Sequence, residues 1–209
     1  MKITLTLSIA TCLTLTLACN PAEREHRDTP AAPADSIIDA TTKAQVSTAD
    51  VNVDGAEKAF IISIYSQSLY TTELATIAAK SQMPALRTLA KNITPSYQKL
   101  IADMEKIAKG KGMLLERNLS KSQQKELNAL KQLSSPTLDQ QVLQKLQTLQ
   151  AAFTNLFKEG QHLTNTDLKT YASNAIKTIQ QQQGPTTKLL NQVNETGSQS
   201  TRPGEVATP

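Results

Sequence analysis

Apolar residues recur at steps of three and four through most of the chain, which is the period of an α-helix that buries one face. No stretch sustains an alternation of apolar and polar residues, so the pattern disfavours strands. Ser120 and Gln123 form a capping-box pattern, which predicts a short helix over residues 120–133. Four long helices are predicted at residues 54–81, 84–110, 136–160 and 164–193.

Two prolines and one capping motif refine the predicted course of these helices. Pro95 lies inside the second long helix, where a proline removes a backbone hydrogen bond, so we expect a kink or a local break there. Gly184-Pro185 predicts an interruption of the last helix for the same reason. Thr164 with Asp167 is expected to cap the start of that helix.

The connections between the helices predict the fold class. Two connections are short, and the third is long and contains the short helix, as in an all-α four-helix bundle with a crossover between the second and third long helices. Aromatic residues make up 3% of the chain and Trp is absent, so we expect an aliphatic core. Burying each Leu or Ile contributes about 2 kcal/mol, which accounts for the apolar stripes without any ligand.

The segments that flank the helices have a different composition. Residues 19–53 and 196–209 are polar, contain several prolines and carry no apolar face. Such segments bury too little surface to offset the entropy of ordering. We therefore expect a flexible tether at 19–53, a bundle domain at 54–195 and a disordered tail at 196–209.

Residues 1–18 have the form of a signal peptide. Lys2 supplies a positive charge, and residues 3–18 are apolar apart from Thr, Ser and Cys12. This apolar run is shorter than the roughly 20 residues that a membrane-spanning helix needs. We predict that the segment is removed on export.

The residues that follow resemble the lipobox of bacterial lipoproteins, in which a small residue precedes a Cys that becomes acylated. The sequence reads Thr16-Leu17-Ala18-Cys19, and it departs from the usual form because Thr16 stands where a Leu is usual. Loss of Cys12 with the leader would leave Cys19 as the single Cys, which cannot form an internal disulfide. We predict lipid attachment at Cys19, in a protein anchored to the outer membrane of the bacterial cell envelope with its domain in the periplasm or at the cell surface. The alternative is ordinary cleavage after Ala18, with Cys19 unmodified.

The charge of the chain excludes one class of partner. The formal net charge is only +4, whereas nucleic-acid binding requires a dense basic face, so no nucleic-acid partner is expected. Two interpretations remain open for one basic segment, a surface that binds anionic lipid headgroups and an ordinary solvated face. Its residues are Lys106, Lys109, Lys111, Arg117, Lys121 and Lys125.

Few residues of the sequence are suited to metal binding or catalysis. Two Glu-x-x-His strings occur, but the first, Glu23 to His26, lies in the tether. The second, Glu159 to His162, straddles Gly160 at a helix end, where the backbone would not hold both ligands to one ion. His26 and His162 are the only two histidines in the sequence, so few candidates exist for the histidine of a catalytic triad. We expect no metal, no cofactor and no enzymatic activity.

Four helical motifs suggest a family. The chain resembles a bacterial envelope family of unknown function with a ferritin-like fold, the domain of unknown function 4142, over residues 60–193. The motifs are Glu73-Leu74 before Ile77-Ala78, Leu86-Arg87-Thr88-Leu89-Ala90, Leu138-Asp139, and Asp167-Leu168-Lys169-Thr170-Tyr171-Ala172.

The resemblance also implies a difference. Members of that family typically carry Asp-His pairs in the second and third helices and a His late in the fourth. The corresponding positions here hold Ser96-Tyr97, residues near Thr148-Leu149, and Gln182, so this member would lack the histidines. Tyr97 could then belong to a polar pocket in the core with Glu73 and Gln182, or it could be a core aromatic whose hydroxyl finds one partner.

Two functions follow from these expectations. The leading hypothesis is a non-catalytic, membrane-tethered helical module that interacts with an unknown envelope protein or has a structural role. The alternative is a ferritin-like protein that binds a metal or a small ligand.

Overall fold

The computed structural model describes residues 46–47 and 53–199, which lie in one compact unit spanning Ser36–Pro209. The predicted signal peptide, Cys19 and His26 lie outside the described residues. Within the described part the fold is all-α, which confirms the predicted class. Its elements are β1 (Val46–Ser47), α1 (Gly55–Ala78), α2 (Pro84–Gly110), β2 (Leu114–Leu115), α3 (Lys121–Leu130), α4 (Thr137–Gly160) and α5 (Thr166–Gln199).

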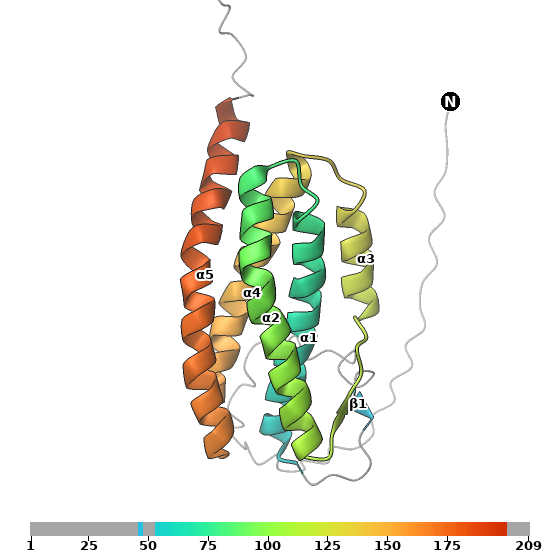
Figure 1. Cartoon of the computed structure of the whole chain (residues 1–209), viewed down its shortest axis with the longest axis vertical. Helices are drawn as coiled ribbons and strands as arrows, with labels where there is room; N and C mark the ends of the chain where they lie inside the picture. The colour runs from blue at the N-terminus through green and yellow to red at the C-terminus, as the bar shows by residue number, and fades with distance from the viewer. Residues whose placement is uncertain (1–45, 48–52, 200–209) are drawn as a thin grey trace, which may run out of the picture. The chain divides into compact units, whose positions relative to one another are not determined.

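The four long helices lie side by side; α2 is antiparallel to α1 and α5 is antiparallel to α4, whereas α4 runs in the same direction as α2 (Figure 1). α1 packs against α2 and α4, and α4 packs against α5. α2 also meets α5, although these two helices touch much less than the other neighbouring pairs. The connection from α2 to α4 runs the length of the helices and includes α3, which packs on α1 and α4 (Figure 1).

Side-chain caps fix the helix starts. The Asp54 carboxylate accepts hydrogen bonds from the backbone N–H groups of Ala56 and Glu57, at 2.9 and 3.2 Å. Ser120 and Gln123 form both bonds of the predicted capping box. The predicted cap of the last helix was wrong by one residue: Asn165 Oδ1 accepts from the backbone N–H of Leu168 at 3.0 Å. Asn caps at least as well as Thr, and the motif alone does not select between adjacent polar residues.

Both interior prolines lie within continuous helices. α5 runs through Pro185, so the interruption predicted at Gly184-Pro185 is wrong; α2 runs through Pro95, so of the kink or local break expected there the break does not occur. Residues just after each proline, Tyr97 and Thr186 among them, are fully buried, and this packing outweighs the lost backbone bond. Gly184 also lacks the Cβ that would crowd the ring of Pro185.

Two boundaries of the flanking segments differ from the prediction. Val46 and Ser47, in the predicted tether, form a two-residue antiparallel pair with Leu115 and Leu114. Backbone hydrogen bonds to another strand stabilise such a pair without an apolar face. At the other end, α5 continues to Gln199, beyond the predicted start of the tail at residue 196.

The core is aliphatic with a small aromatic cluster, in which Phe60 and Phe157 meet edge to face at 6.2 Å. Most of the predicted apolar stripes are buried. Four of their residues are only partly buried: Leu69 of α1, Ile107 of α2, Leu156 of α4 and Ala175 of α5. No helix of residues 53–199 has the length and hydropathy of a membrane span.

Candidate functional site

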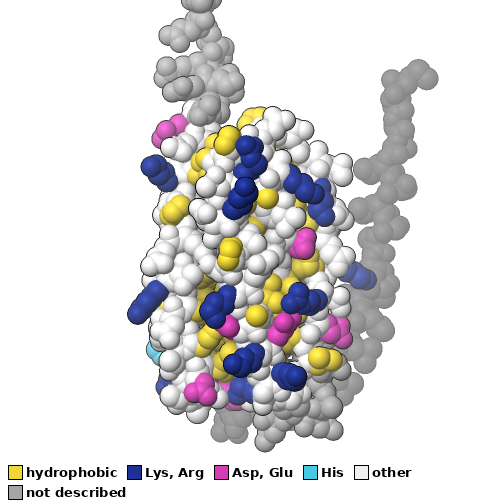
Figure 2. Space-filling view, viewed as in Figure 1, with side chains coloured by type: hydrophobic (Ala, Val, Ile, Leu, Met, Phe, Trp, Pro, Cys, Tyr) yellow, Lys and Arg dark blue, Asp and Glu magenta, His cyan; other side chains and the backbone are white. Residues whose placement is uncertain are grey.

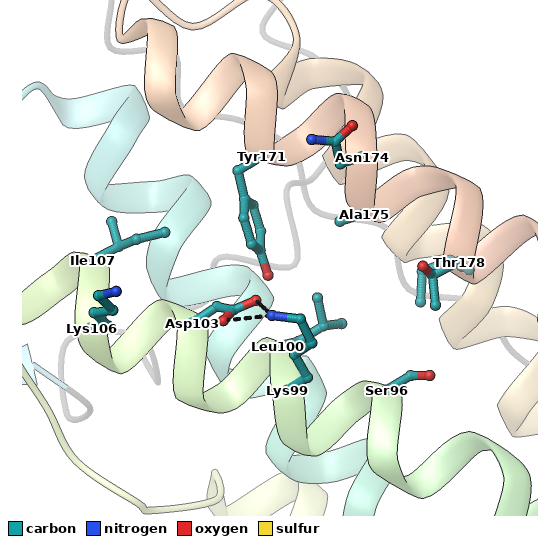
Figure 3. Close-up of a pocket in the computed structure, with 11 residues that line it drawn as sticks. Ser96, Lys99, Leu100, Asp103, Lys106, Ile107, Tyr171, Asn174, Ala175 and Thr178 are labelled. Carbon is teal, nitrogen blue, oxygen red and sulfur yellow. Dashed lines mark hydrogen bonds and ion pairs between the residues drawn. The ribbon is translucent and has the colours of Figure 1, made fainter.

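A groove of about 620 Å³ separates α2 from α5 where the two helices fail to meet (Figure 3). We call it the α2–α5 groove. Its volume lies within the range of roughly 300–1,000 Å³ that is common for small-molecule sites. It is lined by Ser96, Lys99, Leu100, Asp103, Lys106, Ile107, Tyr171, Asn174, Ala175, Thr178 and Ile179.

The helical period explains how two kinds of side chain line this groove. On each helix the lining residues recur every three or four positions, so they form one stripe along one face. Leu100, Ile107, Ala175 and Ile179 form an apolar floor, and polar side chains stand on both rims. Small side chains at Ser96 and Ala175 leave the space between the helices unfilled (Figure 3).

Charged residues gather on the α2 side of the groove. Lys99 Nζ lies 3.0 and 2.8 Å from the two carboxylate oxygens of Asp103, one helical turn away. The Lys99 side chain is 74% exposed, so this ion pair contributes little to stability. Lys106 is exposed and has no ion-pair partner within the described part of the chain. Among the charged residues that line the groove, Lys106 is therefore the one whose charge is not balanced by an ion pair.

Tyr171 reaches across the groove from α5. Its hydroxyl points toward Asp103 (Figure 3), and its ring packs edge-on against Phe157 at 6.4 Å. Burial raises the pKa of Tyr171, and the neighbouring carboxylate of Asp103 raises it further. The hydroxyl oxygen is buried, and it makes no hydrogen bond of regular geometry with any described residue. It remains a protonated donor at neutral pH.

A second polar cluster lies inside the bundle. Gln150 and Thr186 are fully buried, and the Gln150 amide donates to the Thr186 hydroxyl at 3.0 Å. Gln183 donates to the Thr154 hydroxyl at 3.0 Å beside them. This cluster was not predicted from the sequence, although Gln150 continues the buried stripe of Leu143, Leu146, Phe153 and Phe157 at helical spacing. A polar residue on an otherwise apolar stripe was the available signal.

Tyr97 adjoins this cluster. It is fully buried and packs on Phe153 with ring centres 5.3 Å apart. Burial raises the pKa of Tyr97, and the nearby Gln150 amide opposes that rise. Although Gln150 is near, the Tyr97 hydroxyl makes no hydrogen bond of regular geometry among the described residues. The expected single partner is therefore not in place.

The three residues of the predicted polar pocket do not come together. Glu73 is exposed, so it is not part of the core, and it lines a separate surface depression with Gln98 and Arg117. Gln182 is half-buried, and its side-chain oxygen has no hydrogen bond within residues 53–199. Glu73 was misplaced because it falls on the outer side of α1, between buried residues of neighbouring stripes.

The predicted basic segment is divided by ion pairs. Lys111 Nζ lies 2.6 Å from the buried Glu57 carboxylate, and Arg117 bonds to Glu105 at 2.9 Å. The remaining residues of the segment are exposed. Figure 2 shows basic side chains scattered over one face, several of them beside acidic ones. The residues that are exposed and have no ion pair within the described ranges are Lys106, Lys109, Lys121 and Lys125.

No group of three or more His, Cys, Asp or Glu side chains among residues 46–47 and 53–199 could hold a metal ion. Glu159 lies in the last turn of α4 and His162 in the turn that follows, and the His162 backbone N–H donates to the Glu159 carbonyl at 2.9 Å.

Comparison with known proteins gives a family and no function. No curated protein and no solved structure matches the chain. A family model described as a domain of unknown function (DUF4142) matches residues 40–189, which is most of the chain and includes nearly all the helices described above. This protein therefore belongs to that family of unknown function.

Proposed function

We propose that this protein is a non-catalytic, lipid-anchored module of the bacterial cell envelope that binds a small molecule in the α2–α5 groove. The fold that we propose for it is the ferritin-like four-helix bundle with a long crossover. This proposal combines the membrane anchor of the tethered helical module with the small ligand of the ferritin-like binding protein, the two functions expected from the sequence.

The observation that carries the binding role is the uncovered floor of the groove. Ile107 and Ala175 continue apolar stripes that are buried elsewhere, yet at this level the two stripes face each other across open space. An apolar floor with a few polar groups on its rims is the usual form of a small-molecule site. Covering that floor with an apolar ligand would release a favourable burial energy of about 25 cal/mol per Å².

The proposed localisation in the cell envelope is supported by the order of segments along the chain. A short apolar leader ends in a Cys preceded by a small residue, Ala18, and Val46 lies 27 positions after Cys19. At full extension such a spacer would reach about 95 Å. A bundle held this way could meet ligands within that distance of the membrane.

The proposed lipid anchor can be tested by substituting the two cysteines, Cys12 and Cys19. Cys19→Ser should move the protein from the membrane fraction to the soluble fraction after cell lysis, because it removes the acylated sulfur. Cys12→Ser is the matched control and should leave the membrane fraction unchanged. Unaltered membrane association of Cys19→Ser would refute the anchor.

The binding role can be tested with a neutral fluorescent probe, N-phenylnaphthylamine. We expect saturable binding by the full chain, and Ala175→Phe should weaken it by about tenfold or more by filling the groove. Ala151→Phe places the same side chain on an exposed position of α4 and is the matched control. Equal affinities of the two variants would show that the probe binds elsewhere and would refute the role of the groove.

A further inference from the structure

We propose that the ligand of the α2–α5 groove is an amphipathic anion, with its apolar body on the floor and its anionic head at Lys106. This inference rests on the proposed function, because it concerns the chemistry of the same site. It goes further by naming which end of the groove receives the charge.

The two ends of the groove differ in character. Lys106 and Ile107 lie at one end, Ser96 and Thr178 mark the other end, and Tyr171 points toward Asp103 between them (Figure 3). A charged head is therefore expected at the first end, and the apolar body would extend along Leu100 and Ile179 toward the second. A molecule with one charged end suits this gradient better than one with charges at both ends.

The sign of the head group follows from the charges already paired. Asp103 is satisfied by Lys99 through two short contacts, which leaves the Lys106 ammonium as the uncompensated charge. A cationic ligand would have to displace Lys99 from Asp103 while lying close to Lys106. An anion can approach Lys106 without breaking any contact, so charge complementarity selects the anion.

Hydrogen-bond donors reinforce this choice. The two ammonium groups and the Asn174 amide offer protons, whereas the groove contains a single carboxylate, which Lys99 already pairs. The Tyr171 hydroxyl is covered by protein and points toward Asp103, so it is not among the donors that a ligand would meet (Figure 3). Carboxylate, sulfonate and phosphate heads all share the required chemistry.

The test compares two probes with similar aromatic bodies, anilinonaphthalene sulfonate and the neutral N-phenylnaphthylamine. The protein is the full chain carrying Cys19→Ser, so that no lipid is attached and no detergent is needed. We expect Lys106→Gln to raise the Kd of the anionic probe about fivefold and to leave that of the neutral probe unchanged. Lys109→Gln removes an equally exposed charge that does not line the groove, and it should change neither.

Each failure has a distinct meaning. Insensitivity of the anionic probe to Lys106→Gln, or equal affinity of the unsubstituted groove for the two probes, would overturn the anionic head while leaving the groove as a binding site. Failure of both probes to bind would overturn the proposed function itself. Loss of folding is excluded by far-ultraviolet circular dichroism of each variant.

Two sources of an amphipathic anion can then be separated by displacement of the bound sulfonate probe. Dodecanoate represents a single-chain lipid anion, and naphthoate represents a compact aromatic anion. Displacement by either one supports the inference and identifies the source. Displacement by neither would contradict it, because both carry the chemistry that the groove is proposed to recognise.

Discussion

Gly160 is the position where a single methyl group should have the largest effect on this fold. It is the last residue of α4 and is buried where that helix passes α1 and α5. A Cβ at this site would lie 2.5 Å from the Phe60 ring and 2.9 Å from the Cβ of Ala172. Carbon atoms pack best at about 3.5–4.0 Å, so Gly160→Ala forces an overlap on two sides.

The neighbours cannot easily move away. The Phe60 ring is only 5% exposed and meets Phe157 edge to face, and Ala172 is fully buried with its Cβ fixed by the α5 backbone. Overpacking of this kind typically costs about 1–3 kcal/mol. The gain in helix propensity from Gly to Ala is at most about 1 kcal/mol, and it is smaller at the end of a helix. We therefore expect a net loss of about 2 kcal/mol, which lowers Tm by about 4–8 °C in a domain of this size.

The assay is urea unfolding followed by far-ultraviolet circular dichroism, with the midpoint compared at constant slope. Gly110→Ala is the matched control, because Gly110 is also the last residue of its helix and a Cβ there would meet nothing within 4 Å. That control should change the free energy of unfolding by less than about 0.5 kcal/mol.

A double-mutant cycle identifies the cause of the loss. If the Phe60 ring carries the clash, Gly160→Ala should cost clearly less in a Phe60→Leu background than in the natural sequence. Wild-type stability of Gly160→Ala, or the same cost in both backgrounds, would refute the close packing of α1 on the end of α4.

Three further outcomes follow from buried polar groups. Burial raises the pKa of Tyr65 to about 12, and above pH 10, the ordinary Tyr pKa, the unfolded chain holds fewer protons than the fold. The free energy of unfolding should therefore fall as pH rises above about 10. Tyrosinate absorbance can follow this unfolding, because the chain has no Trp. Titration of all tyrosines near pH 10 in the folded state would contradict the raised pKa of Tyr65. Thr186→Val leaves the Gln150 amide unpartnered and should cost about 1–3 kcal/mol in urea unfolding, whereas an unchanged midpoint would show that the pair adds nothing. Glu126→Gln weakens the bonds from Tyr70 and Lys145 that hold α3, and should speed amide hydrogen exchange in α3 alone; equal rates would refute that role.

The helices were predictable because their signals are local. Apolar periodicity and the capping box lie within single segments, and the bounds of α2 agree with the prediction. The interruption at Gly184-Pro185 was wrongly predicted for a non-local reason. Whether a helix survives a proline depends on how much the following turn buries, as Thr186 and Leu189 do after Pro185.

The groove could not be predicted in the same way. Leu100, Ile107, Ala175 and Ile179 all fall within the recurrence of apolar residues at steps of three and four that predicts a buried helix face. Only the spacing between two helices far apart in the chain decides whether facing stripes touch, and a single sequence does not record that distance. The free charge of Lys106 likewise depends on which basic residues find a partner, and Lys111 with its bond to Glu57 shows the other outcome.

The most direct test of the central claim is a crystal structure of the full chain carrying Cys19→Ser with anilinonaphthalene sulfonate. The account predicts density between α2 and α5, with the aromatic body over Ala175 and the sulfonate within hydrogen-bond distance of Lys106. Density at another surface of the bundle, or a groove closed by direct contact of Ile107 with α5, would contradict it.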